Sequence, residues 1–156
     1  MINVPMTVRM LRTLQELERA VGDLYRDYIA AFPEEAELWA RLSAAERRHE
    51  ELLGEMVRMV QADPALFSPG RPLNEKVVMT TVSGVRSQQA ALTGEGRTLR
   101  QALFIARDLE QSILESKYKE IVESRSQAYT DWLSRILQET VEHRMWLEEG
   151  IARHPE

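Results

Sequence analysis

The sequence predicts an all-α protein, a four-helix bundle of two antiparallel helical hairpins joined by a long crossover that contains a short extra helix. Three observations support this prediction. Four long segments carry apolar side chains at helical spacing. Only six prolines and seven glycines interrupt the 156 residues. No two segments show the alternating pattern expected of a strand pair. The length suits a single domain that spans residues 1–156.

The first hairpin is predicted from two long amphipathic segments. The first helix runs from about Thr7 to Phe32, and its apolar face holds Leu11, Leu14, Val21, Tyr25, Tyr28 and Phe32. Pro33 then opens the second helix, because proline is well tolerated in the first turn of a helix. The second helix continues to about Gln61, before the breaker Ala62-Asp63-Pro64.

The second hairpin follows a crossover of about 35 residues, from Ala62 to Arg97. The crossover holds the turn sequence FSPGRPLN and then a shorter helix from Leu73 to Leu92. The third long helix is expected over residues 98–124 and the fourth over residues 127–153. Their apolar positions are Leu99, Leu103, Ala106, Ile113 and Ile121, and Trp132, Leu133, Ile136, Trp146, Leu147 and Ile151. Short links within the hairpins and one long crossover between them are typical of a ferritin-like bundle.

Composition excludes several classes of function. The net charge of −5 argues against a nucleic-acid partner. The absence of cysteine excludes disulfides, thiolate metal sites and cysteine nucleophiles. No apolar run approaches the ~20 residues that span a bilayer, and the N-terminal segment lacks the apolar core of a signal peptide. We therefore expect a cytoplasmic protein with neither a nucleic-acid nor a membrane partner.

Polar residues interrupt the apolar faces of the predicted helices. In the second helix, Glu46 and His49 lie within the otherwise apolar series Trp39, Leu42, Leu53, Met56 and Val60. Glu18, Glu110 and His143 interrupt the faces of the other three helices. Any one core-facing histidine is more often satisfied by a neighbouring residue than by a metal. Several buried carboxylates together need compensation, however, and a pair of divalent cations would supply it.

These residues resemble the rubrerythrin-like branch of the ferritin superfamily of di-iron carboxylate proteins, without its rubredoxin domain. The resemblance rests on ERAVGDLY, on Glu46-Arg-Arg-His49, on Glu110 in ARDLEQSILESKY, and on His143 in QETVEHRMW. It implies that Glu18 and Glu110 are outer carboxylate ligands and that Glu46 bridges two metal ions. It also implies that His49 and His143 complete the ligand set, and that Tyr25 supports the ligands from outside.

The fourth helix departs from the pattern of this family. The family places a glutamate three residues before the histidine, where this chain has Thr140, while Glu139 lies four residues before His143. One explanation is that a ligand has been lost, so that the site holds one metal or binds weakly. The other is a π-type turn that brings Glu139 into the ligand set. The third helix also suggests an irregularity, since Glu110 and Tyr118 are eight residues apart and Glu18 and Tyr25 seven.

The expected function is therefore that of a non-haem di-metal protein. The resemblance implies two iron ions, with a single ion or manganese as alternatives, and either reduction of hydrogen peroxide or oxidation of ferrous iron by oxygen or peroxide. Electrons would come from a separate donor protein, because the chain has no second redox site. We expect a homodimer that associates through apolar residues of the crossover. The alternative is a degenerate bundle with a partial metal site, acting as a metal-binding or structural interaction module.

Overall fold

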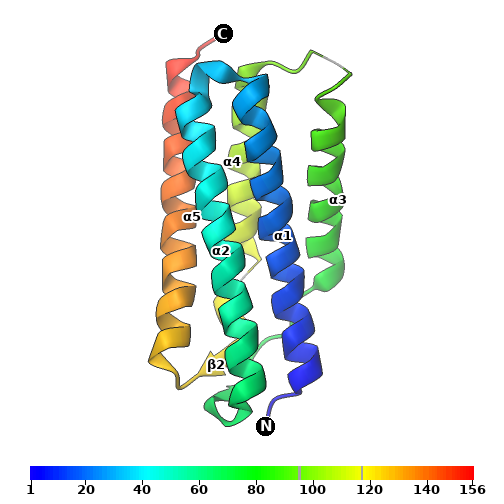
Figure 1. Ribbon diagram of the computed structural model, residues 1–156, viewed down its shortest axis with the longest axis vertical. Coiled ribbons are helices and arrows are strands. Elements are labelled where there is room, and N and C mark those ends of the chain that lie inside the picture. The colour runs from blue at the N-terminus through cyan, green and yellow to red at the C-terminus, as the bar shows by residue number, and fades with distance from the viewer. Residues whose placement is uncertain (95, 117) are drawn as a thin grey trace.

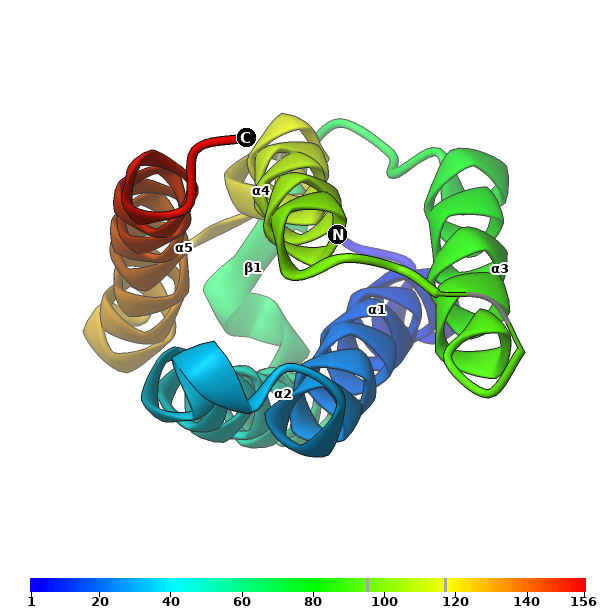
Figure 2. The same ribbon diagram turned by 90° about the horizontal axis from the view of Figure 1, so that it is seen from above.

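The computed structural model describes residues 1–94, 96–116 and 118–156, and these form a helical bundle. The helices are α1 Val4–Ala31, α2 Ala36–Ala62, α3 Glu75–Ala91, α4 Leu99–Glu115 and α5 Gln127–Arg153. Helices α1, α2, α4 and α5 run side by side, and α3 lies outside them (Figures 1 and 2). The two predicted hairpins, α1–α2 and α4–α5, and the helix in the crossover are therefore confirmed.

The hairpin of α1 and α2 contributes about half of the buried apolar residues. Asn3 caps α1 by accepting a hydrogen bond from the backbone N–H of Met6, and the single 3₁₀ turn Pro33–Glu35 separates the two helices. All seven residues of the interrupted face of α2 are buried. Gly22 allows α1 to approach α2 closely, because a Cβ there would lie 3.1 Å from the Cβ of Glu46.

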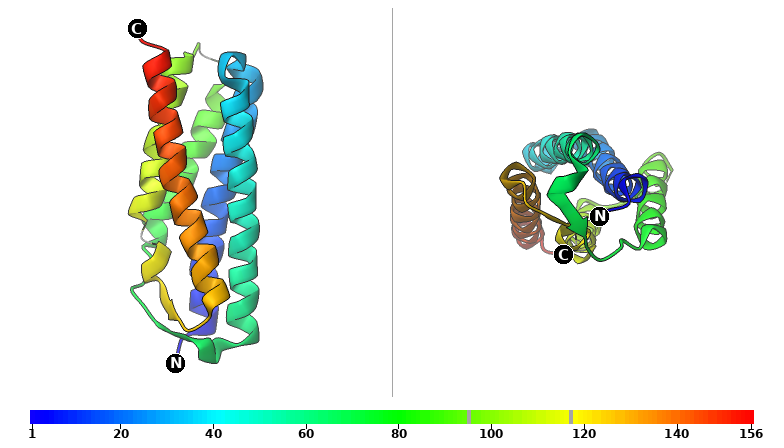
Figure 3. Two further views of the ribbon diagram at one scale, coloured as in Figure 1. Left: turned by 90° about the vertical axis from the view of Figure 1, so that its left-hand side faces the viewer. Right: turned by 90° about the horizontal axis from the view of Figure 1, so that it is seen from below.

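The third long helix is shorter than expected, since α4 ends at Glu115 rather than near Ser124. The chain then forms a 3₁₀ turn, Tyr118–Glu120, and a short strand, β2 Val122–Ser124. Strand β2 pairs antiparallel with β1 Phe67–Pro69 and closes the bundle end at which the chain begins (Figure 3). The expectation that no strand pair exists was wrong, because strands of three residues are too short to show an alternating pattern.

The crossover helix α3 packs against α1 (Figure 2). It buries Val78, Val82 and Val85. Two polar contacts fix it to α1, one from Arg86 to Asp23 at 2.9 Å and one from Gln89 to Asp27 at 2.7 Å. On its outer side, Val77 and Met79 remain exposed. None of the helices in the described residues combines the length and the apolar character needed to cross a membrane.

Candidate metal centre

Each of the four bundle helices contributes a buried polar side chain near its middle. Glu18 lies on α1, Glu46 and His49 on α2, Glu110 on α4 and His143 on α5. The first four are fully buried and His143 is 1% exposed. The structure thus brings the five ligand candidates from separate helices to one level of the core. Helical periodicity explains why, since each occupies a core-facing position of an otherwise apolar stripe.

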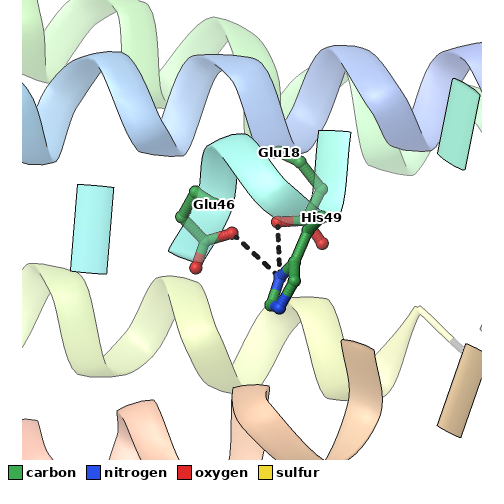
Figure 4. Close-up of side chains that lie close together, drawn as sticks. All are labelled: Glu18, Glu46 and His49. Atoms are coloured by element: carbon green, nitrogen blue, oxygen red, sulfur yellow. Dashed lines mark ion pairs between the residues drawn. The ribbon is translucent and has the colours of Figure 1, made fainter. Parts of the chain in front are cut away.

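The first group of candidate ligands, named the first position here, consists of Glu18, Glu46 and His49. One ligand atom from each residue lies within 4.8 Å of the others. Both carboxylates face the same ring nitrogen of the histidine (Figure 4). The Nδ1 atom of His49 lies 3.7 Å from Oε2 of Glu18 and 3.5 Å from Oε2 of Glu46.

The second group, named the second position, consists of Glu46, Glu110 and His143. The Nδ1 atom of His143 lies 3.2 Å from Oε1 of Glu46 and 3.7 Å from Oε1 of Glu110. Glu46 therefore belongs to both positions and directs one oxygen to each. The imidazole rings of His49 and His143 stack with 5.6 Å between centroids. The two positions consequently lie next to each other.

Several atoms at the two positions have no hydrogen-bond partner among the residues that the structure describes. They are Oε2 of Glu18, Oε2 of Glu46, Oε2 of Glu110 and Nδ1 of His49. A buried polar atom without a partner costs about 1–3 kcal/mol, and more when it is charged. A cation placed among these atoms would satisfy them together. Carboxylate oxygen and imidazole nitrogen are ligands that iron and manganese accept, so the residues present fit a metal centre.

Two buried tyrosines support the outer carboxylates in a crossed arrangement. Tyr25 on α1 donates to Oε1 of Glu110 on α4 at 2.8 Å, and Tyr118 donates to Oε1 of Glu18 at 3.0 Å. Burial, together with nearby carboxylates, raises the pKa of both phenols well above their usual value, so both remain donors at neutral pH. The resemblance indicated Tyr25 but not Tyr118. The eight-residue spacing from Glu110 to Tyr118 is the signal in the sequence that could have pointed to it.

Burial and charge also perturb the ligand candidates. Burial and the carboxylates of Glu110 and Glu18 raise the pKa of Glu46 well above its usual value. Burial lowers the pKa of each imidazole, but the adjacent carboxylates outweigh it and raise the pKa of His49 to about 11 and that of His143 to about 10. The two histidines are therefore cationic at neutral pH and must release protons before they bind a metal ion.

The fourth helix does not contain the π-type turn that would bring Glu139 into the ligand set. Helix α5 is a continuous α-helix, and Glu139 lies outside both positions. Its Oε2 atom accepts a hydrogen bond from Nε2 of His49 at 3.1 Å, on the ring edge away from the carboxylates. Thr140 is buried but donates to the backbone oxygen of Ile136 at 2.7 Å, so its hydroxyl is directed to its own helix.

Glu139 is also held from the solvent side. Its Oε1 atom accepts a hydrogen bond from Nε of Arg135 at 3.1 Å, and its side chain is 19% exposed. Burial raises the pKa of Glu139, but the contacts with Arg135 and His49 outweigh burial and lower it. Glu139 is thus an ionised group at the edge of the core.

Comparisons of the chain with protein-family models, with curated proteins and with solved structures find no match. The functional argument therefore rests on the geometry of the site.

Proposed function

We propose that the chain is a ferritin-like, rubrerythrin-related protein that holds two iron ions at the first and second positions. The single observation that carries this proposal is the placement of Glu46. Its two carboxylate oxygens face two different histidines, His49 and His143. A carboxylate shared in this way between two groups is the arrangement expected of a bridging ligand in a di-metal carboxylate bundle.

The ligand set supports iron or manganese, and the resemblance to the rubrerythrin-like branch favours iron. A pair of iron ions there would supply the two electrons that, with two protons, convert hydrogen peroxide to two water molecules. The alternative reaction is the oxidation of ferrous iron by oxygen or peroxide. The chain contains no cysteine and so offers no thiolate site for a second redox centre. The electrons would come from a separate donor protein.

The other residues of the centre position these ligands. Tyr25 and Tyr118 hold the outer carboxylates by hydrogen bonds and leave one oxygen of each directed to the centre. The surrounding core is apolar and excludes bulk water.

The direct test is the metal content of protein purified from iron-supplemented cells. We expect about two irons per chain in the natural sequence, with near-ultraviolet absorption from the ferric centre. Glu46→Gln should lose both irons, whereas Glu148→Gln, an exposed change on α5, should keep them. A chain that purifies without metal, or a Glu46→Gln variant that keeps its full content, would overturn the proposal. If two irons are found, peroxide consumption with an added reductant tests turnover.

A second candidate function is metal binding without redox turnover, in a degenerate bundle that acts as a metal-binding or structural interaction module. Thr140 is the observation that favours it, because the threonine hydroxyl is directed to the backbone and supplies no second bridging carboxylate. With Glu46 as the bridge, this module would bind metal but consume no peroxide above the rate of the Glu46→Gln variant. The peroxide assay therefore separates the two functions.

A further inference from the structure

The two histidines of the centre differ at the ring nitrogen that faces away from the carboxylates. Nε2 of His49 donates to Oε2 of Glu139 at 3.1 Å. Within the described residues, Nε2 of His143 has no hydrogen-bonded partner, and its nearest aromatic neighbour is Trp146, whose ring centroid lies 5.3 Å from that of His143. The difference matters because the group on the outer nitrogen of a histidine ligand fixes its tautomer.

The hydrogen bond with Glu139 determines which nitrogen of His49 is available to a metal. An ionised carboxylate can only accept a hydrogen bond, so Nε2 must carry the proton. The lone pair of neutral His49 then lies on Nδ1, the atom that faces Glu18 and Glu46. A carboxylate on the outer nitrogen also makes the imidazole a stronger ligand. Glu139 therefore prepares His49 for the first position without contacting the metal.

The geometry around Glu139 makes this contact a stable one. Arg135, one turn earlier on α5, binds the other carboxylate oxygen at 3.1 Å. Arg48 on α2 approaches Oε2 at 4.0 Å. These two arginines orient the carboxylate at the boundary between α2 and α5. Partial burial strengthens the contact, since only 19% of the Glu139 side chain is exposed.

The remaining support of the two positions is nearly the same. Each has one histidine, one share of Glu46 and one outer carboxylate that accepts a hydrogen bond from a tyrosine. Among the described residues, the carboxylate of Glu139 on His49 has no counterpart on His143. We propose that the two positions are unequal and fill in order, with the first position binding its metal before the second because Glu139 orients His49. This inference rests on the proposed function.

The experiment is an anaerobic titration of the full chain with Mn²⁺, with free Mn²⁺ measured by electron paramagnetic resonance. We expect two binding steps in the natural sequence. Removal of a carboxylate that supports a histidine ligand costs about 10–100-fold in metal affinity. Glu139→Gln keeps a hydrogen-bond acceptor but loses the charge, so this variant should weaken the tighter step by about tenfold. Glu139→Ala, which loses both, should weaken it by about 100-fold. Glu148→Gln is the matched control and should leave both steps unchanged.

Two further variants assign the steps to residues. His49→Ala should remove the tighter step, and His143→Ala the weaker one. A single step with two equal sites, or equal weakening of both steps by Glu139→Ala, would overturn the ordered filling and leave the two-metal proposal intact. A natural chain that binds no Mn²⁺ at all would overturn both.

A second measurement needs no metal. The ¹⁵N chemical shifts of the imidazole nitrogens report the hydrogen bonds that their N–H groups donate. His49 is cationic at neutral pH, so its Nε2 carries a proton there. Glu139→Ala should therefore shift the Nε2 resonance of His49 and leave the shifts of His143 unchanged. Unchanged shifts of His49 in this variant would overturn the positioning role of Glu139.

Discussion

Glu46→Gln should separate metal binding from the stability of the protein. Burial and the carboxylates of Glu110 and Glu18 raise the pKa of Glu46 well above its usual value, so the charged form of this side chain is disfavoured when no metal is bound. Glutamine has the same shape and carries no charge. Its amide oxygen can accept from His143, and its amide group can donate toward Glu18. The unfolding free energy without metal should therefore change by less than about 1 kcal/mol.

The effect on metal-linked stability should be much larger. A ligand present at 100 times its dissociation constant stabilises the folded state by about 2.7 kcal/mol per site. The structure has two positions that share Glu46. Both together should contribute about 5 kcal/mol, which raises the melting temperature of a domain of this size by about 10–20 °C. Glu46→Gln should lose the whole increase, and Glu18→Gln, which affects only the first position, about half of it.

The assay is thermal unfolding followed by circular dichroism, with and without Mn²⁺. The exposed variant Glu148→Gln serves as the control and should show the full increase. The reasoning is refuted if Glu46→Gln keeps the metal-dependent increase in melting temperature. It is also refuted if Glu18→Gln loses as much as Glu46→Gln, because Glu46 would then not be shared between two positions.

Four other substitutions test further parts of the structure. Tyr118→Phe removes the hydrogen bond to the outer carboxylate of the first position and should weaken Mn²⁺ binding about tenfold in the same titration. Gly70→Ala would place a Cβ within 2.7 Å of backbone atoms, so it should lower the free energy of unfolding by about 1–3 kcal/mol. Gly84 lies in open space on α3, so Gly84→Ala should raise the free energy of unfolding by about 0.5–1 kcal/mol. Denaturant unfolding measures both changes. The hydrogen bonds from Arg153 lower the pKa of Glu35 despite partial burial, so this contact stabilises the fold above the usual glutamate pKa and is lost as the pH falls below it. Glu35→Gln should therefore cost up to about 1 kcal/mol at pH 7 and clearly less at pH 3; an equal cost at both values would exclude the ionic contribution.

The ligand candidates could be predicted because each interrupts a long apolar helical face. Glu46 and His49 lie three residues apart on a stripe that is otherwise apolar, and this spacing places both in the core regardless of the details of packing. Glu18, Glu110 and His143 follow from the same argument on the other helices. Their burial is a consequence of periodicity, which is a local property of the chain.

The role of Glu139 could not be predicted in this way. Its place in the sequence, four residues before His143, suggested a ligand to the same metal. Instead its carboxylate contacts His49, a residue 90 positions earlier. The rotation of α5 about its own axis decides this contact, and that rotation depends on packing against α2.

The chain after α4 shows a second limit. The apolar spacing continues to Ile121, and this continuity predicted a longer helix. Ile121 is indeed buried, but it reaches the core from an irregular segment, because the chain turns after Glu115 to pair β2 with β1. Residue Phe67 pairs with Ser124, so the interaction that ends the helix is a long-range one.

The sequence by itself determined the helical class, the two hairpins, the crossover helix and the five buried ligand candidates, because helical periodicity and the residues that end helices are encoded locally. The tertiary structure alone decided which oxygen of Glu46 faces which histidine, that Tyr118 donates to Glu18, and that Glu139 contacts His49. Each of these contacts joins side chains on different helices. Its geometry depends on the relative rotation and height of those helices, which only the packed core determines.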